Sequence, residues 1–135
     1  MNKPTKKILI VDDDADIRES VRLALEEQDY LNIEVTESAN VASGIQQMKS
    51  INPDIVILDL HMPEKTGFDF MDIVHKNKRF AKTKVIMLTA DDTIDNVFKA
   101  ESKGIGVYNF LGKPFNISDL QALVLSLSLP VKTKV

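Results

Sequence analysis

Three short runs in this chain are apolar without interruption and rich in β-branched residues. They occupy residues 8–11, 55–58 and 85–88. Because these runs do not alternate with polar residues, they are typical of strands that are covered on both faces. Such strands belong to parallel sheets with helices on both sides, so we expect an α/β fold.

Segments with helical periodicity alternate with the strand-like runs. Apolar residues three and four positions apart predict helices in 17–28, 41–48, 68–74, 92–103 and 120–127, with Ser38 or Asn40 capping the second and Asn116 the last. An alternating run at 33–37 predicts a half-exposed edge strand, and 107–111 predicts a fifth strand. Five strands and five helices in alternation predict a doubly wound, five-stranded parallel sheet with right-handed crossovers.

Length and composition narrow the class of protein further. The 135 residues suit one domain, with a core at about 6–129 and a tail or the start of a linker at 130–135, after Pro130 stops the last helix. The net charge of −3 argues against direct nucleic-acid binding, and the absence of cysteine excludes thiol chemistry. No apolar run is long enough to cross a membrane and no signal peptide is evident, so a cytoplasmic location is expected.

Five polar side chains follow the predicted strands directly. Asp12 and Asp13 follow the first strand, Asp59 the third, Thr89 the fourth and Lys113 the fifth. Each could be an isolated cap or loop residue. However, functional residues of a doubly wound sheet gather at the carboxyl ends of its strands, so their coincidence favours one shared crevice.

The chemistry of this set points to phosphate. Three neighbouring carboxylates repel one another unless a cation neutralises them, and an oxygen-only donor set suits Mg²⁺. Lys113 would balance further negative charge, and the Thr89 hydroxyl could donate to phosphoryl oxygens. The reaction that fits is phosphoryl transfer to an aspartate, which forms an acyl phosphate whose hydrolysis resets the site.

Four motifs in this order resemble the receiver domain of the two-component response regulators. They are Ile8-Leu9-Ile10-Val11-Asp12-Asp13, Ile57-Leu58-Asp59-Leu60-His61-Met62-Pro63 with Gly67 beyond it, Met87-Leu88-Thr89-Ala90, and Lys113-Pro114-Phe115. Each motif is weak alone, but the set is highly specific and covers residues 6–129. The resemblance implies a flavodoxin-like sheet with strand order 2-1-3-4-5.

The resemblance also implies roles for the acids. Asp59 is similar to the phosphoacceptor of the family. Asp13 and Asp59 would bind Mg²⁺ directly, together with the backbone carbonyl of His61, and Asp12 would act mainly through water.

Further roles follow from the same resemblance. Thr89 is similar to the switch hydroxyl, Phe110 to the switch aromatic residue, and Lys113 to the lysine that contacts the phosphoryl group. The Lys113–Pro114 bond resembles the family's cis peptide. His61 and Asp91 occupy positions beside the path of an attacking water, where they would tune the phosphate lifetime, although His61 could equally be a loop residue without a role.

One stretch departs from the family pattern. The interval from Thr89 to Lys113 is longer than usual, with the extra residues placed best near 102–105. This leaves the end of the fourth helix open, and that helix belongs to the family's signalling face.

The function that the resemblance implies is that of a phosphorylated switch rather than an enzyme. Its expected partners are a histidine kinase or histidine phosphotransfer protein and a downstream protein or effector domain, with dimerisation on phosphorylation as one outcome. The chain could be a stand-alone receiver or part of a longer regulator.

Three other functions are conceivable for a chain with this pattern. An aspartyl phosphohydrolase would need a second acid two residues after Asp59, where this chain has His61. A flavodoxin-like cofactor binder would need a phosphate-binding loop after the first strand, where this chain has acids. A receiver-like docking module that takes no phosphate remains an alternative that only a phosphorylation assay excludes.

Overall fold

The structure is a computed structural model that describes residues 3–89 and 107–129. Its elements are β1 (Thr5–Val11), α1 (Ala15–Glu26), β2 (Asn32–Ser38), α2 (Val41–Ile51), β3 (Ile55–Asp59), α3 (Gly67–His75), the 3₁₀ helix η1 (Lys78–Phe80), β4 (Lys84–Thr89), β5 (Val107–Gly112) and α5 (Ile117–Ser128). The helix expected at 92–103, the extra residues near 102–105 and the tail at 130–135 lie outside the described residues.

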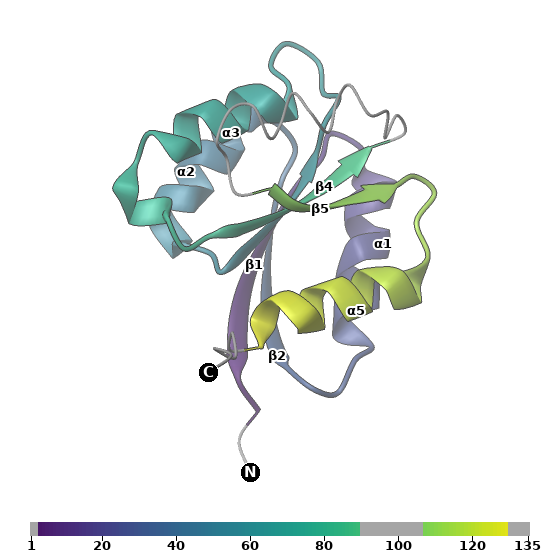
Figure 1. The fold of residues 1–135 in the computed structure, drawn as a ribbon. Helices are drawn as coiled ribbons and strands as arrows, with labels where there is room; N and C mark the ends of the chain where they lie inside the picture. Colours follow the sequence, from purple (N-terminus) through teal and green to yellow (C-terminus); the bar gives the residue numbers. More distant parts are fainter. Residues whose placement is uncertain (1–2, 90–106, 130–135) are drawn as a thin grey trace.

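The five strands form one parallel sheet in the order β2-β1-β3-β4-β5. This confirms the predicted flavodoxin-like α/β fold, with β2 at an edge as its alternating pattern indicated. Helices α2 and α3 cover one face of the sheet, and α1 and α5 cover the other (Figure 1).

The uninterrupted apolar runs are explained by this double cover. Successive side chains of a strand point to opposite faces of the sheet. Leu9 and Val11 therefore pack with α2 and α3, whereas Ile8 and Ile10 pack with α1 and α5. Every residue of β3 is buried, Asp59 included. A polar residue inside these runs would face a helix on either side, so the first polar positions come only where the strands end.

The helices begin where side chains can accept hydrogen bonds from free backbone N–H groups. Asp14 caps α1, and Asn40, one of the two expected candidates, caps α2. Thr66 caps α3 in a reciprocal pair with Asp69, and Asn116 caps α5 as predicted. Because each cap replaces bonds that the first helical turn cannot make, these residues fix where each connection from the sheet ends.

The end of the first helix differs from the prediction. The apolar pattern extended the first helix to Gln28, but α1 ends at Glu26. The Gln28 side chain instead donates to the carbonyls of Leu25 and Leu31, at 3.1 and 2.8 Å, and accepts from the N–H groups of Tyr30 and Leu31. Gln28 therefore stabilises the turn after the helix and is not part of the buried helical stripe.

No helix within 3–89 or 107–129 has both the length and the apolar character needed to span a membrane.

Candidate functional site

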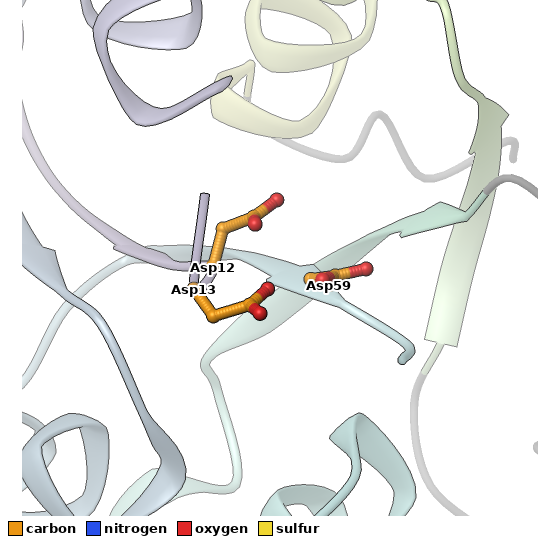
Figure 2. Close-up of side chains that lie close together, drawn as sticks. All are labelled: Asp12, Asp13 and Asp59. Atoms are coloured by element: carbon orange, nitrogen blue, oxygen red, sulfur yellow. The ribbon is translucent and has the colours of Figure 1, made fainter. Parts of the chain in front are cut away.

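Three carboxylates meet at the carboxyl end of the sheet. Asp12 and Asp13 follow β1 directly, and Asp59 is the last residue of β3. One carboxylate oxygen from each residue lies within 4.8 Å of the others. Figure 2 shows the three side chains close together at the ends of these strands. Asp12 and Asp59 are buried, whereas Asp13 is exposed and opens the cluster to solvent.

The loop that carries Asp12 is held by bonds that the sequence did not reveal. The Asp12 N–H donates to the carbonyl of Ser38 at 3.1 Å, and the Asp12 carboxylate accepts from the N–H of Asp14 at 2.9 Å. Arg18 Nη1 donates to the Asp12 carbonyl at 2.8 Å, and Arg18 Nε pairs with Glu37 at 3.2 Å. The sequence does not single out Arg18, because its contact is with a backbone carbonyl that no side-chain pattern records.

Gly67 sets the position of Asp59 through close backbone contact. A Cβ atom at Gly67 would lie 2.5 Å from the carbonyl oxygen of Asp59 and 3.1 Å from the Cα of Leu60. The Gly67 N–H donates to the carbonyl of Leu60 at 2.9 Å, and the Leu60 N–H donates to Leu88 at 3.0 Å. The first residue of α3 therefore rests directly on the end of β3, which only glycine allows.

Lys113 is the cation of the site. It follows β5 directly, and its N–H donates to the carbonyl of Thr89 at 2.8 Å. Its Nζ lies 2.9 Å from Asp12 Oδ2 and 3.4 Å from Asp59 Oδ1. One ammonium group thus stands between two buried carboxylates and relieves part of their repulsion.

The surroundings shift the pKa values of Asp59 and Lys113. Burial, and then the negative charge of Asp12, raise the pKa of Asp59 to about 6, although Lys113 and the His61 N–H offset part of the rise. Burial by itself would lower the pKa of Lys113, but its hydrogen bond to Asp12 and the charges of Asp12 and Asp59 together raise it above its ordinary value. The site is therefore short of positive charge when no metal is bound.

The other candidate residues lie where the strand ends place them. Thr89 is buried at the end of β4, and Phe110 in β5 is half-buried against the α2–α3 side of the core. His61 has an exposed side chain, and its N–H donates to Asp59 Oδ1 at 3.3 Å. The Lys113–Pro114 peptide bond is cis. Asp91 lies outside the described residues.

Replacing Lys113 with methionine tests the charge balance of the site. In metal-free buffer near pH 8 we expect the free energy of unfolding to fall by about 1–2 kcal/mol, because the variant leaves two buried carboxylates without their cation. The pKa of Lys113 is raised in the folded protein, so its contribution is fully present below the ordinary lysine pKa and is lost only above it. Urea denaturation measures the change. Lys65→Met, at an exposed position, is the control, and an equal loss in both variants would contradict the assignment.

The raised pKa of Asp59 predicts a pH-dependent stability. Between about pH 4 and 6 the folded protein holds a proton that the unfolded chain has released, so the free energy of unfolding falls across this interval and stays lower above about pH 6. In EDTA, Asp59→Asn should therefore raise the free energy of unfolding by about 1–2 kcal/mol near pH 8, with a much smaller effect near pH 4.5. Urea denaturation of both proteins at the two pH values provides the test, and a gain of the same size at both would count against it.

The donor set fits a magnesium ion. Mg²⁺ prefers oxygen ligands, keeps several waters and usually binds through one or two carboxylates. Asp12, Asp13 and Asp59 offer clustered carboxylate oxygens, and the exposure of Asp13 leaves room for water. This acidic triad is typical of the Mg²⁺ site in receiver domains.

Comparison with known families agrees with this architecture and site. Residues 8–125 match the model of the response regulator receiver domain. The chain belongs to this family, whose members act in two-component signal transduction and are not conventional enzymes.

Curated relatives support the same family. The chain is 30% identical over 120 residues to response regulator Rre1 of Synechocystis, covering 89% of this chain and 50% of the relative. It is 32% identical over 117 residues to the phosphate regulon transcriptional regulatory protein PhoB of Pseudomonas aeruginosa, covering 87% of this chain and 49% of the relative. The chain thus spans about half the length of these curated relatives.

Solved structures match over nearly their whole length. The chemotaxis protein CheY4 of Vibrio cholerae superposes with a TM-score of 0.82 at 28% identity, covering 91% of this chain and 98% of CheY4. A putative response regulator from Chloroflexus aurantiacus gives a TM-score of 0.81 at 28% identity, covering 93% and 98%. Both similarities place the described residues in the receiver fold.

Proposed function

We propose that this chain is a phosphoacceptor receiver in which Asp59 takes a phosphoryl group from a histidine kinase or a histidine phosphotransfer protein. The observation that carries the proposal is the position of Lys113 Nζ, 2.9 Å from Asp12 and 3.4 Å from Asp59, beside three clustered carboxylates. A cation and an acidic cluster around one aspartate are the groups needed to bind and orient a phosphoryl group.

The two oxygens of Asp59 are unequal in the described part of the chain. Oδ1 accepts from the His61 N–H and faces Lys113 Nζ, whereas no hydrogen bond to Oδ2 is present within 3–89 and 107–129. In the proposed reaction Oδ2 attacks phosphorus, the bond from phosphorus to the donor histidine nitrogen breaks, and the aspartyl phosphate forms. Attack of water on phosphorus later releases phosphate and restores the Asp59 carboxylate.

The residues that would hold Mg²⁺ are Asp13, Asp59 and the backbone carbonyl of His61, with Asp12 acting mainly through water. When bound, the ion offsets the charge of the carboxylates and the phosphoryl oxygens. Lys113 would move its hydrogen bond from Asp59 to a phosphoryl oxygen, which explains why a flexible ammonium group suits this position.

The signal would leave the site through Thr89 and Phe110. An acyl phosphate adds about two negative charges, which can attract the Thr89 hydroxyl through a charge-assisted hydrogen bond. Phe110, two strand positions before Gly112, would then turn further inward and reshape the face that includes β5 and α5. A partner with different affinities for the two shapes would read the change.

The proposal extends to the partners and the output of this chain. The partners are a histidine kinase or phosphotransfer protein upstream and a downstream protein or effector domain, with a phosphorylation-dependent dimer as one form of output. Because the chain spans about half of its curated relatives, an effector domain could belong to the whole protein. A cytoplasmic location remains a prediction.

Incubation with acetyl phosphate and Mg²⁺ tests the proposal. We expect the intact mass to rise by one phosphoryl group and the added mass to be lost on treatment with hydroxylamine, which cleaves acyl phosphates. Chelation of Mg²⁺ should prevent the gain. An unchanged mass would favour the docking module, and sustained turnover of a generic phosphate ester would favour a phosphohydrolase.

A further inference from the structure

The amino-terminal end of the sheet carries a cluster of cations far from the acidic site. No acid occurs between Asp72 and Asp91, and this interval contains Lys76, Lys78, Arg79, Lys82 and Lys84. Since the strands are parallel, the cations that precede β4 lie at the end of the sheet opposite Asp59. This group of cations and the acidic cluster of Asp12, Asp13 and Asp59 therefore lie at opposite ends of the sheet.

Two adjoining hollows indent this end of the molecule. One has a volume of about 530 Å³ and is lined by Lys6, Lys82 and Lys84 beside the end of α5. The other has a volume of about 320 Å³ and is lined by Lys78, Arg79 and Lys82. Lys82 and Asp54 border both. We call the two hollows together the basic groove.

The backbone beneath the basic groove is firmly held. Three hydrogen bonds to backbone carbonyls hold it. The Asp54 N–H donates to the carbonyl of Lys7 at 2.8 Å, the Lys84 N–H to that of Asp54 at 3.0 Å, and the Thr83 hydroxyl to that of Pro53 at 2.9 Å. Arg79 Nη2 donates to the carbonyl of Lys49 at 2.7 Å. The groove is therefore a preformed feature rather than a gap between loose side chains.

Several of its cations lack internal counter-charges. In the described part of the chain, Lys6, Lys78 and Lys82 form no salt bridge. Among residues 3–89 and 107–129, Asp54 is the only acid that lines the two hollows, and its carboxylate accepts a hydrogen bond from the Lys7 N–H at 2.8 Å. The groove thus presents positive charge that a bound anion can neutralise.

We propose that the basic groove binds an acidic segment of a partner protein. A nucleic acid or a lipid surface would bring an extended polyanion towards a domain that is acidic overall, and its phosphates would meet Asp54. A short acidic peptide places its carboxylates among the lysines while its backbone N–H groups can donate to Asp54. The two hollows also suit side chains projecting from a strand-like peptide better than a flat membrane surface.

Fluorescence anisotropy with a labelled oligoglutamate peptide tests this surface without using the phosphorylation site. We expect salt-sensitive binding that Lys82→Glu weakens at least about tenfold, because the change replaces an attraction with a repulsion. Lys65→Glu makes the same charge change at an exposed position near the other end of the sheet and should alter binding little. Asp59→Asn should also bind normally, so failure of the phosphoacceptor role would not affect this result.

Parallel titrations with a single-stranded oligonucleotide and with phosphatidylglycerol vesicles separate the competing anions. Weaker binding of both than of the peptide supports the proposal. Absence of peptide binding, equal losses in Lys82→Glu and Lys65→Glu, or tighter binding of the oligonucleotide or vesicles would overturn it.

Discussion

Asp59→Asn is expected to abolish phosphorylation by acetyl phosphate in the presence of Mg²⁺. The amide removes the attacking carboxylate but keeps the size of the side chain and an oxygen that can still accept from His61. Intact-mass measurement should therefore show no phosphoryl gain under conditions that label the wild-type protein. The loss should be complete, because the reaction needs this nucleophile to form the new bond.

Asp54→Asn is the matched control for this change. Asp54 precedes the same strand, β3, at its opposite end, and its side-chain oxygen accepts from the backbone of Lys7, which an asparagine can also do. We expect normal labelling of this variant. Persistent labelling of Asp59→Asn would show that another side chain takes the phosphoryl group.

The second large effect is expected at Gly67. Alanine there would place a methyl group 2.5 Å from the Asp59 carbonyl oxygen, so either α3 or the end of β3 must move. Because both contacting groups are backbone, we expect a loss of about 2–4 kcal/mol in the free energy of unfolding, as for other overpacked buried sites. Labelling at Asp59 should slow as well, since the shift displaces the phosphoacceptor itself. Urea denaturation and the rate of mass gain measure the two effects.

Gly44→Ala provides the comparison, because it makes the same substitution in α2 against side chains. The added methyl would meet Phe70 at 2.9 Å and Val11 at 3.1 Å, and side chains can shift more readily than backbone. Alanine also favours the helix by about 0.5–1 kcal/mol, which offsets part of the strain. A loss at Gly44 equal to that at Gly67 would contradict the special role of the α3–β3 contact.

Much of the fold could be predicted because the strands are covered on both faces. A buried strand shows as an uninterrupted apolar run such as that before Asp59, and its end shows as the first polar residue. Helix starts were equally legible at Asn40 and Asn116, since capping depends on a side chain close in sequence. The helix end at Glu26 could not be predicted, because Gln28 continues the helical spacing. Its side-chain amide instead donates hydrogen bonds to the backbone carbonyls of Leu25 and Leu31.

The residues of the candidate site could be predicted from the sequence, but the contacts that hold them in place could not. Parallel strands bring their carboxyl ends to one edge, so Asp12 and Lys113, 101 residues apart, could be expected to meet. Two supporting contacts could not be predicted: that of Arg18 with the Asp12 carbonyl and that of Gly67 with the Asp59 backbone. In both, the group that is contacted belongs to the backbone. Such contacts depend on the packed structure and leave no periodic trace in the sequence.

The groove at the opposite end illustrates the same limit. The run of lysines before β4 is visible in the sequence, where it would ordinarily be taken for a solvated surface. Only the structure shows that Asp54 and Lys82 line two adjoining hollows, one of which is also bounded by the end of α5, and this distinguishes the groove from scattered charge.

The most direct test of the phosphoacceptor assignment is to locate the phosphoryl group chemically. Sodium borohydride reduces an aspartyl phosphate to homoserine, which stays in the chain and can be found by peptide mass spectrometry. After labelling with acetyl phosphate and Mg²⁺, we predict homoserine at position 59 and at no other aspartate. Homoserine at Asp12 or Asp13 with Asp59 unchanged, or a labelled protein without homoserine, would contradict the account.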